Sequence, residues 1–265
     1  QKTFALKGNI IYTKERTRFE VMEQGWLVCE EGRVRDVYSV LPEELKGIPV
    51  EDMEDRLIIP GLTDLHIHAP QYTFRSLGMD MELLEWLETN TFPEESKYKD
   101  AEYAKKAYEM FAEQLKKSAT VRACIFGTIH NEATLILMDL LEEAGLHTMV
   151  GKVNMDRNSP DYLCEPSAEA SAQATREWLK AVADRKYKNT RPILTPRFTP
   201  SCTDELMELL KEIQTETHLP MQSHLSENPG EIAWVKELCP WSEFYGDAYD
   251  KFGLFGGDCP TVMAH

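Results

Sequence analysis

Hydrophobic and polar positions divide the chain into two regions with different patterns. Up to about residue 57, short apolar runs alternate with polar turns, a pattern typical of short strands. Before residue 80 the only helical signal is a short turn at Pro42–Leu45. Residues 1–57 are therefore predicted to form a small antiparallel β unit, with strands at Phe4–Thr13, Phe19–Gln24, Trp26–Glu30 and Arg33–Val40.

From residue 58 onward, strand patterns alternate with helical patterns. The expected helices place their apolar residues on one face at intervals of three and four. They are Ala101–Lys117, a helix with Asn131 as its N-cap, Ala168–Arg185, Asp204–Thr217 and a helix that starts at Asn228-Pro229. The expected strands are Leu57–His66, Thr120–Phe126, Thr148–Asn154, Pro192–Phe198, Met221–Ser226 and Thr261–His265.

Regular alternation of strand and helix predicts a parallel sheet with right-handed crossovers. A dinucleotide-binding fold would need a glycine-rich turn after its first strand, and Leu65–Tyr72 contains no glycine. The fold class that fits better is α/β, a (β/α)8 TIM-type barrel. Since residues 58–265 supply the first six strands, this barrel domain is expected to be incomplete at its C-terminus.

Composition limits the classes of partner. The 265 residues carry a formal net charge of −16, which disfavours nucleic acid and anionic membranes and suits a neutral small molecule. No apolar run reaches the ~18–20 residues that a membrane-spanning helix needs, and the N-terminus has no signal-peptide pattern. The six cysteines form no CxxC pair, so reduced thiols and a cytoplasmic location are expected.

Four of the seven histidines fall at the ends of predicted strands. His66 and His68 are two positions apart, so on a strand their imidazoles point to the same face and form half of a metal site. His224 and His265 close later strands and would converge with them at the carboxyl ends of the barrel strands. Surface or core-edge roles are expected for the other three, which are His130, His147 and His218.

Two further positions each allow two interpretations. Glu227, at a strand-to-helix junction, is either a proton shuttle beside a metal-activated water or a helix-entry acid. Arg197, at the end of a strand, either donates to a carbonyl or carboxylate of a substrate or forms a salt bridge. The adjacent Phe198 offers either a stacking face or core packing.

Several motifs together resemble the amidohydrolase superfamily and, within it, the family of guanine deaminases. The resemblance runs along nearly the whole chain. The first motif marks the superfamily, and the segments Leu83–Leu87, Thr91–Pro93 and Thr195–Phe198 point to the narrower family. The motifs are Pro60–Tyr72, Leu83–Leu87, Thr91–Pro93, Thr195–Phe198, Ser223–Asn228 and Val262–His265.

The resemblance implies hydrolysis of guanine to xanthine and ammonia by a zinc-activated water. It implies His66, His68 and His224 as metal ligands, and Glu227 and His265 as catalytic residues. Substrate-binding positions implied by the match are Gln71, Arg197, Phe198, His224 and His265. It further implies a homodimer and a small β-sandwich domain beside the barrel.

The resemblance also bears on the metal. Binuclear members of the superfamily carry a bridging lysine at the end of the fourth strand, where this chain has Arg197. A guanidinium has no lone pair to give, so one ion per subunit is expected. Iron(II) accepts the same ligands as zinc, and the sequence leaves the choice between them open.

Members of the family continue beyond the sixth strand, with a seventh strand and an eighth whose aspartate completes the metal site. They also return a C-terminal segment to the small β domain. We therefore expect the sequence to be part of a longer protein. Two alternatives stay open: an amidohydrolase that acts on another aminopurine, a pyrimidine or a triazine, and a non-catalytic scaffold with the same fold.

Overall fold

The computed structural model describes residues 3–265. Contacts divide the chain into two compact units, with the division between Gly61 and Leu62. It falls after the expected boundary at residues 57 and 58 because Leu57 and Ile58 pair with the first strand of the N-terminal unit. Each unit is described by itself.

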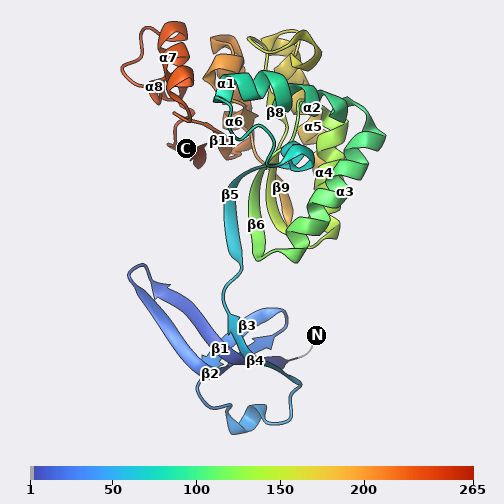
Figure 1. The fold of residues 1–265 in the computed structure, drawn as a ribbon, viewed down its shortest axis with the longest axis vertical. Coiled ribbons are helices and arrows are strands. Elements are labelled where there is room, and N and C mark those ends of the chain that lie inside the picture. Colours follow the sequence, from blue (N-terminus) through green and yellow to red (C-terminus); the bar gives the residue numbers. More distant parts are fainter. Residues whose placement is uncertain (1–2) are drawn as a thin grey trace. The chain divides into compact units, whose positions relative to one another are not determined.

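The N-terminal unit is a single four-stranded sheet in the order β3-β2-β1-β4 (Figure 1). Ala5, Val28 and Leu45 form its small buried core. The strands are β1 (Phe4–Glu15), β2 (Arg18–Glu30), β3 (Arg33–Tyr38) and β4 (Val50–Ile58), with one 3-10 turn at Glu43–Leu45.

Three expectations for this region are corrected. Phe19–Gln24 and Trp26–Glu30 belong to one strand, because Gln24 absorbs the irregularity at a left-handed φ of 48° while pairing continues on both sides. The sheet is not purely antiparallel, since β4 runs parallel to β1. The predicted strand Leu57–His66 is wrong at its start, because its first two residues extend β4.

The larger unit has a TIM-barrel-like α/β fold. Within residues 62–265 every strand pair is parallel, and six successive strand positions follow one another along the chain. A bridge between Leu194 and Met221 links the fourth position to the fifth. The positions are β5 (Leu62–His68), β6 (Thr120–Phe126), β7 with β8 (His147–Gly151, Val153–Asn154), β9 with β10 (Thr190–Pro192, Thr195–Pro196), β11 (Met221–His224) and β12 (Thr261–Ala264).

The third and fourth strand positions are each interrupted, which the sequence did not predict. β7 and β8 are separated at Lys152, and β9 ends at Pro192. Proline has no N–H to donate to a ladder, and Thr195 turns its hydroxyl to the carbonyl of Ile193 at 3.1 Å. The upper parts of both positions, β8 and β10, pair separately.

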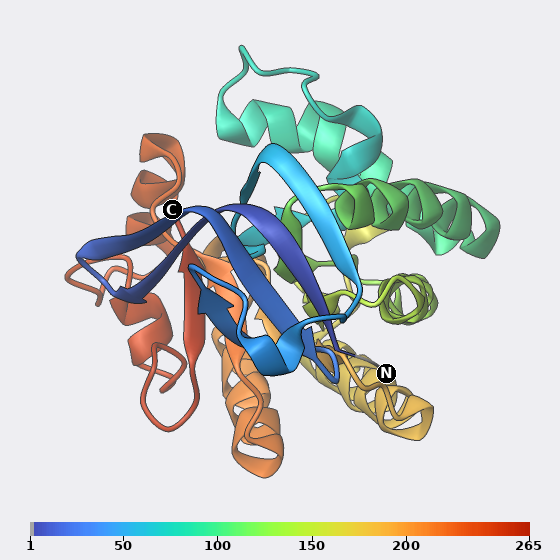
Figure 2. The same cartoon turned by 90° about the horizontal axis from the view of Figure 1, so that it is seen from below.

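The longer helices lie outside the strands, as Figures 1 and 2 show. The predicted bounds of α3 (Ala101–Lys117), α5 (Ala168–Arg185) and α6 (Asp204–Thr217) are confirmed. α7 (Pro229–Leu238) begins, as expected, after Asn228, which forms a capping box with Glu231.

The expected N-cap role of Asn131 is wrong. His130 occupies the N-cap position of α4 (Asn131–Glu143), and no side chain caps the helix there. The Asn131 side chain instead donates to the carbonyl of Ala174 at 2.8 Å, so it links α4 to α5.

Between β5 and α3 the chain makes a long excursion, residues 69–100, which we call the β5–α3 segment. It contains a 3-10 helix before residue 80, where only strands and turns were expected. Tyr98 anchors the segment to its own start by donating to the carbonyl of Pro70 at 3.1 Å. Its helices are Ala69–Phe74, α1 (Leu83–Trp86), a π-helical turn Leu87–Thr91, α2 (Phe92–Ser96) and Lys97–Lys99; the unit is completed by α8 (Asp247–Asp250) and 3-10 turns at Asp161–Leu163 and Thr199–Ser201.

Candidate active site

A cavity of about 460 Å³ is lined by strand ends and by the β5–α3 segment. Its wall includes every residue that the sequence marked as a candidate for chemistry: His66, His68, Gln71, Arg197, Phe198, His224, Glu227 and His265. The β5–α3 segment adds mainly apolar and aromatic side chains: Tyr72, Arg75, Leu83, Trp86 and Leu87.

Three histidines meet in this cavity. His66 and His68 come from β5 with ring centroids 5.0 Å apart, and the His224 ring from β11 lies 4.8 Å from that of His66. The Nε2 atoms of His68 and His224 are 2.9 Å apart. One ring nitrogen from each residue lies within 4.8 Å of the others, so the three form a group that can hold a metal ion.

The donor set fits a metal by its chemistry as well as by its spacing. His224 Nδ1 lies 2.6 Å from the Arg197 carbonyl oxygen, which can only accept, so this nitrogen carries the proton. The lone pair of His224 is therefore on Nε2, directed toward His68 and available to a cation.

The electrostatics also favour neutral imidazoles. Burial lowers the pKa of His66 to about 4, and the nearby His265 and Arg197 add to this effect while Asp64 opposes it. Burial and the neighbouring histidines hold the pKa values of His68 and His224 well below the ordinary range. Neutral imidazole is the form that ligates metals, so the site needs no deprotonation at neutral pH.

Glu227 stands beside this group on the turn between β11 and α7. Its Oε1 lies 3.6 Å from His265 Nε2, and burial raises its pKa although the neighbouring His265 opposes that rise. The turn is tightly held: Ser226 adopts a left-handed φ of 61°, and the Glu227 N–H donates to Glu231 at 2.8 Å. Tyr245 donates to the other oxygen of Glu231 at 2.6 Å.

Arg197 and Phe198 follow β10 and face the same cavity. Arg197 Nη1 donates to Glu95 Oε2 at 2.6 Å, and both side chains are buried. The guanidinium also lies 5.3 Å from the Phe92 ring centroid. Arg197 thus forms the salt bridge of one interpretation and also lies in the cavity wall, while its donation to a substrate stays a prediction.

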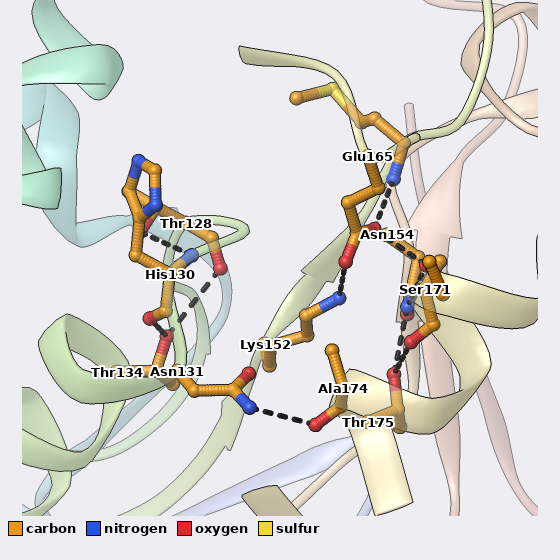
Figure 3. Close-up of polar contacts among 12 residues, drawn as sticks. Thr128, His130, Asn131, Thr134, Lys152, Asn154, Glu165, Ser171, Ala174 and Thr175 are labelled. Atoms are coloured by element: carbon orange, nitrogen blue, oxygen red, sulfur yellow. Dashed lines mark hydrogen bonds and ion pairs between the residues drawn. The ribbon is translucent and has the colours of Figure 1, made fainter. Parts of the chain in front are cut away.

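A buried polar network includes Asn154, whose backbone contacts that of Arg197; Figure 3 shows the side chains of this network around Asn154 and Glu165. The Arg197 N–H donates to the backbone carbonyl of Asn154 at 3.2 Å. The Asn154 side chain donates to Ser171 and Thr175, each at 2.8 Å, and Ser171 donates to Glu165. Glu165 in turn pairs with the fully buried Lys152, so the network links the strand position of Asn154 to α5.

Sequence reasoning missed Glu95. It lies in α2 immediately after another acid, Glu94, and nothing in the local pattern distinguishes the two. Glu94 binds its own segment and the start of α3, through Thr73, Lys97 and Tyr103, whereas Glu95 reaches Arg197. The partner is separated by 102 residues, which a local pattern cannot show.

The histidines for which no chemistry was expected do not line the cavity. His130 precedes α4, His147 is the exposed first residue of β7, and His218 ends α6 in a left-handed conformation at φ 56°. Within the described residues, no helix is long and apolar enough to cross a membrane.

Comparison with known proteins identifies the family of this chain. The model of the amidohydrolase family matches residues 57–264, and the chain belongs to that family. Within it, the chain is 37% identical over 276 residues to the guanine deaminase of Dictyostelium discoideum, covering 98% of this chain and 61% of that protein. It is also 37% identical to the guanine deaminase of Mus musculus over 97% of this chain and 53% of the relative.

A solved structure gives the same result in three dimensions. The crystal structure of guanine deaminase from C. acetobutylicum with bound guanine in the active site superposes with a TM-score of 0.94 at 46% identity. The match covers 99% of this chain and 62% of that one. The resemblance stated from the motifs is confirmed, and the chain spans between about half and two thirds of the length of these relatives.

Proposed function

We propose that the protein of which these residues form part hydrolyses guanine to xanthine and ammonia. The observation that carries the proposal is one cavity in which His66, His68 and His224 face Arg197 and Glu227. The relatives named above, whose printed names are guanine deaminase, support the same reaction.

The metal in this proposal is one zinc ion, held by His66, His68 and His224. When bound, zinc supplies the Lewis acidity that makes water a nucleophile at neutral pH. An aspartate beyond residue 265 is proposed to complete the ligand set, as the family resemblance implies. Iron(II) is the competing metal, and metal analysis of the purified protein decides between them.

Recognition is assigned to three residues that line the cavity. Arg197 donates N–H groups to the purine carbonyl, and its fixed guanidinium plane suits an acceptor in one orientation. Gln71 hydrogen-bonds the ring edge, and Phe198 stacks on the ring face. His224 and His265 complete the contacts around the carbon that bears the amino group.

Proton transfer is assigned to Glu227, with His265 beside it. Burial raises the pKa of Glu227, which suits a group that must both accept and donate a proton near neutral pH. Glu227 takes a proton from the attacking water and delivers it to the ring nitrogen next to the reacting carbon. The proton of the hydroxyl group now on that carbon is then passed to the amino group, the C–N bond breaks and the C=O bond forms, so guanine and water give xanthine and ammonia.

Several parts of this proposal concern the whole protein. They are a closed eight-stranded barrel, a β-sandwich completed by a returning C-terminal segment, a homodimer and a cytoplasmic location. The six cysteines form no disulfide in this structure, which is compatible with a reducing compartment.

The test uses the full-length protein loaded with zinc and follows ammonia release from guanine, with and without a chelator. We expect release that the chelator abolishes and that added zinc restores. Absence of release from the zinc-loaded protein would overturn the proposal. Release from another aminopurine, a pyrimidine or a triazine instead would identify a different deaminase, and failure to bind metal would indicate a non-catalytic scaffold.

A further inference from the structure

The contact between Arg197 and Glu95 is a buried ion pair at the edge of the substrate cavity. Arg197 is 2% exposed and Glu95 is fully buried. Arg197 lines the cavity, whereas Glu95 stands behind it on α2. The carboxylate therefore acts on the cavity only through the arginine.

Stability does not explain this pair. Removing two charges from water costs free energy that is recovered only when the remaining lone pairs and protons are also satisfied. Glu95 Oε1 is buried and has no hydrogen-bond partner among the described residues. The adjacent Glu94, by contrast, has partners for both of its oxygens, in Thr73, Lys97 and Tyr103.

The pair changes the charge of the cavity wall while leaving most of its donors free. A guanidinium offers five N–H donors, and Glu95 occupies one nitrogen. Without the carboxylate, a permanent positive charge would lie among Phe92, Leu87 and Phe198, where low polarity strengthens its attraction for anions. With it, the wall presents donors that carry little net charge.

We propose that Glu95 is a positioning residue that neutralises Arg197, so that the site selects uncharged carbonyl-bearing heterocycles over anionic ones. This inference rests on the proposed function, because it assumes that Arg197 meets the purine carbonyl. It also favours release of the product. Xanthine is a stronger acid than guanine, and its monoanion binds weakly beside a neutralised arginine and the acidic Glu227.

The experiment compares the metal-loaded full-length protein with its Glu95→Gln variant, which keeps the shape and removes the charge. Calorimetric titration measures the dissociation constants of xanthine, below and above its ring-proton pKa, and of hypoxanthine, which stays neutral throughout. In the original protein we expect xanthine to lose affinity relative to hypoxanthine as it becomes anionic. In the variant this preference should shift toward the anion by about tenfold or more, corresponding to one pKa unit of differential interaction.

Two further variants keep the test decisive. Glu95→Asp retains the charge and should retain the original selectivity. Glu94→Gln changes the neighbouring acid, which does not line the cavity, and should leave the selectivity between neutral and anionic ligands unchanged. A purely structural role of Glu95 would weaken both forms of xanthine equally. Unchanged selectivity in the Glu95→Gln variant, with both ligands still bound, overturns the inference.

Binding is measured without turnover, so the two proposals fail separately. If the original protein releases no ammonia from guanine but the Glu95→Gln variant gains affinity for the anion, the proposed function fails and the charge inference stands. If guanine is deaminated and charge selectivity does not change, the inference alone fails.

Discussion

At the scale of single residues, Arg197 and Glu227 place opposite charges in the wall of one cavity, and each is held by a different partner. Arg197 is bound to Glu95 on one side and presents its remaining donors to the cavity. Glu227 stands on a turn fixed by Glu231 and faces His265. The proposed roles of both residues lead to separate kinetic predictions.

Replacing Arg197 by alanine removes the proposed partner of the purine carbonyl and leaves Glu95 as an uncompensated buried charge. We expect kcat/KM for guanine to fall by about 100-fold or more, as is found when a charged hydrogen-bond partner is lost. Steady-state kinetics measures this, and far-ultraviolet circular dichroism monitors folding. Unchanged turnover of guanine in a folded Arg197→Ala variant would contradict the assignment.

Replacing Glu227 by glutamine keeps its size and removes its ability to carry a proton. We expect kcat to fall by roughly 10²–10⁴-fold, the usual contribution of a general acid or base, while KM changes little. The exposed Glu243→Gln variant serves as the control. A parallel rise of KM with little loss of kcat would show that Glu227 binds substrate instead of moving protons.

At the scale of elements, polar contacts inside the protein fix the strand ends on which the site stands. Asn154 binds the Arg197 backbone and is itself held by α5, and Lys152 and Glu165 close the network. At the C-terminal end of α4, Glu142 accepts from the backbone N–H groups of Lys188, Asn189 and Thr190 at 2.8, 2.9 and 2.9 Å. These contacts join helices to strands at positions that the hydrophobic pattern of the sequence does not predict.

Breaking the buried pair of Lys152 and Glu165 should lower stability much more than breaking an exposed ion pair. Lys152→Met leaves Glu165 buried without its cation, so we expect the free energy of unfolding to fall by about 3–5 kcal/mol. The matched control is Arg176→Ala, which breaks an exposed pair with Glu216 and should cost about 0–1 kcal/mol. Urea denaturation measures both, and equal losses in the two variants would refute the distinction.

Glu142 predicts a dependence of stability on pH. Burial opposes ionisation, but the three backbone donors outweigh it and hold the pKa of Glu142 below its ordinary value of 4.5. A lowered pKa in the folded state means that the stabilisation is present above about pH 4.5 and is lost as the pH falls through the folded pKa.

The Glu142→Gln variant tests this dependence by urea unfolding. It should be less stable by about 0–1 kcal/mol near neutral pH, because solvent screens the carboxylate, and the difference from the original protein should shrink in acid. The exposed neighbour Glu143→Gln provides the control. A difference that stays constant down to acid pH would show that the charge of Glu142 is not responsible.

At the scale of the whole molecule, the proposed ligands connect distant parts of the strand order. His66 and His68 lie on the first strand position of the larger unit and His224 on the fifth. An ion that binds the folded state but not the unfolded chain therefore stabilises the fold. The gain is about 2.7 kcal/mol when the free ion concentration is a hundred times the dissociation constant.

Metal removal should consequently lower Tm. For a unit of this size we expect a shift of about 5–10 °C on treatment with a chelator, measured by differential scanning calorimetry and reversed by added zinc. His68→Ala should abolish the metal response, and the exposed His147→Ala should keep it. A chelator response that survives in the His68→Ala variant would place the ion elsewhere.

Local signals in the sequence predicted much of this architecture but not all of it. The bounds of α3, α5 and α6 are correct because the apolar periodicity lies within each helix and a capping side chain immediately precedes it. Asn131 was misassigned because its side chain serves a tertiary contact with α5, and Glu95 was missed because its partner is remote. The cluster of candidate residues could be predicted from the sequence because the carboxyl ends of parallel strands meet at one edge.

Most of the cavity wall comes from two parts of the chain, and this has an evolutionary consequence. The histidines and Glu227 come from strand ends and a rigid turn, whereas Gln71, Trp86, Leu87 and the Glu95 support belong to the β5–α3 segment. The segment is a continuous stretch of sequence, so exchange or redesign of residues 69–100 can alter ligand preference while the metal-binding side chains stay in place. Adaptive substitutions that create new substrate preferences should therefore accumulate in this one stretch, as if it were an exchangeable module.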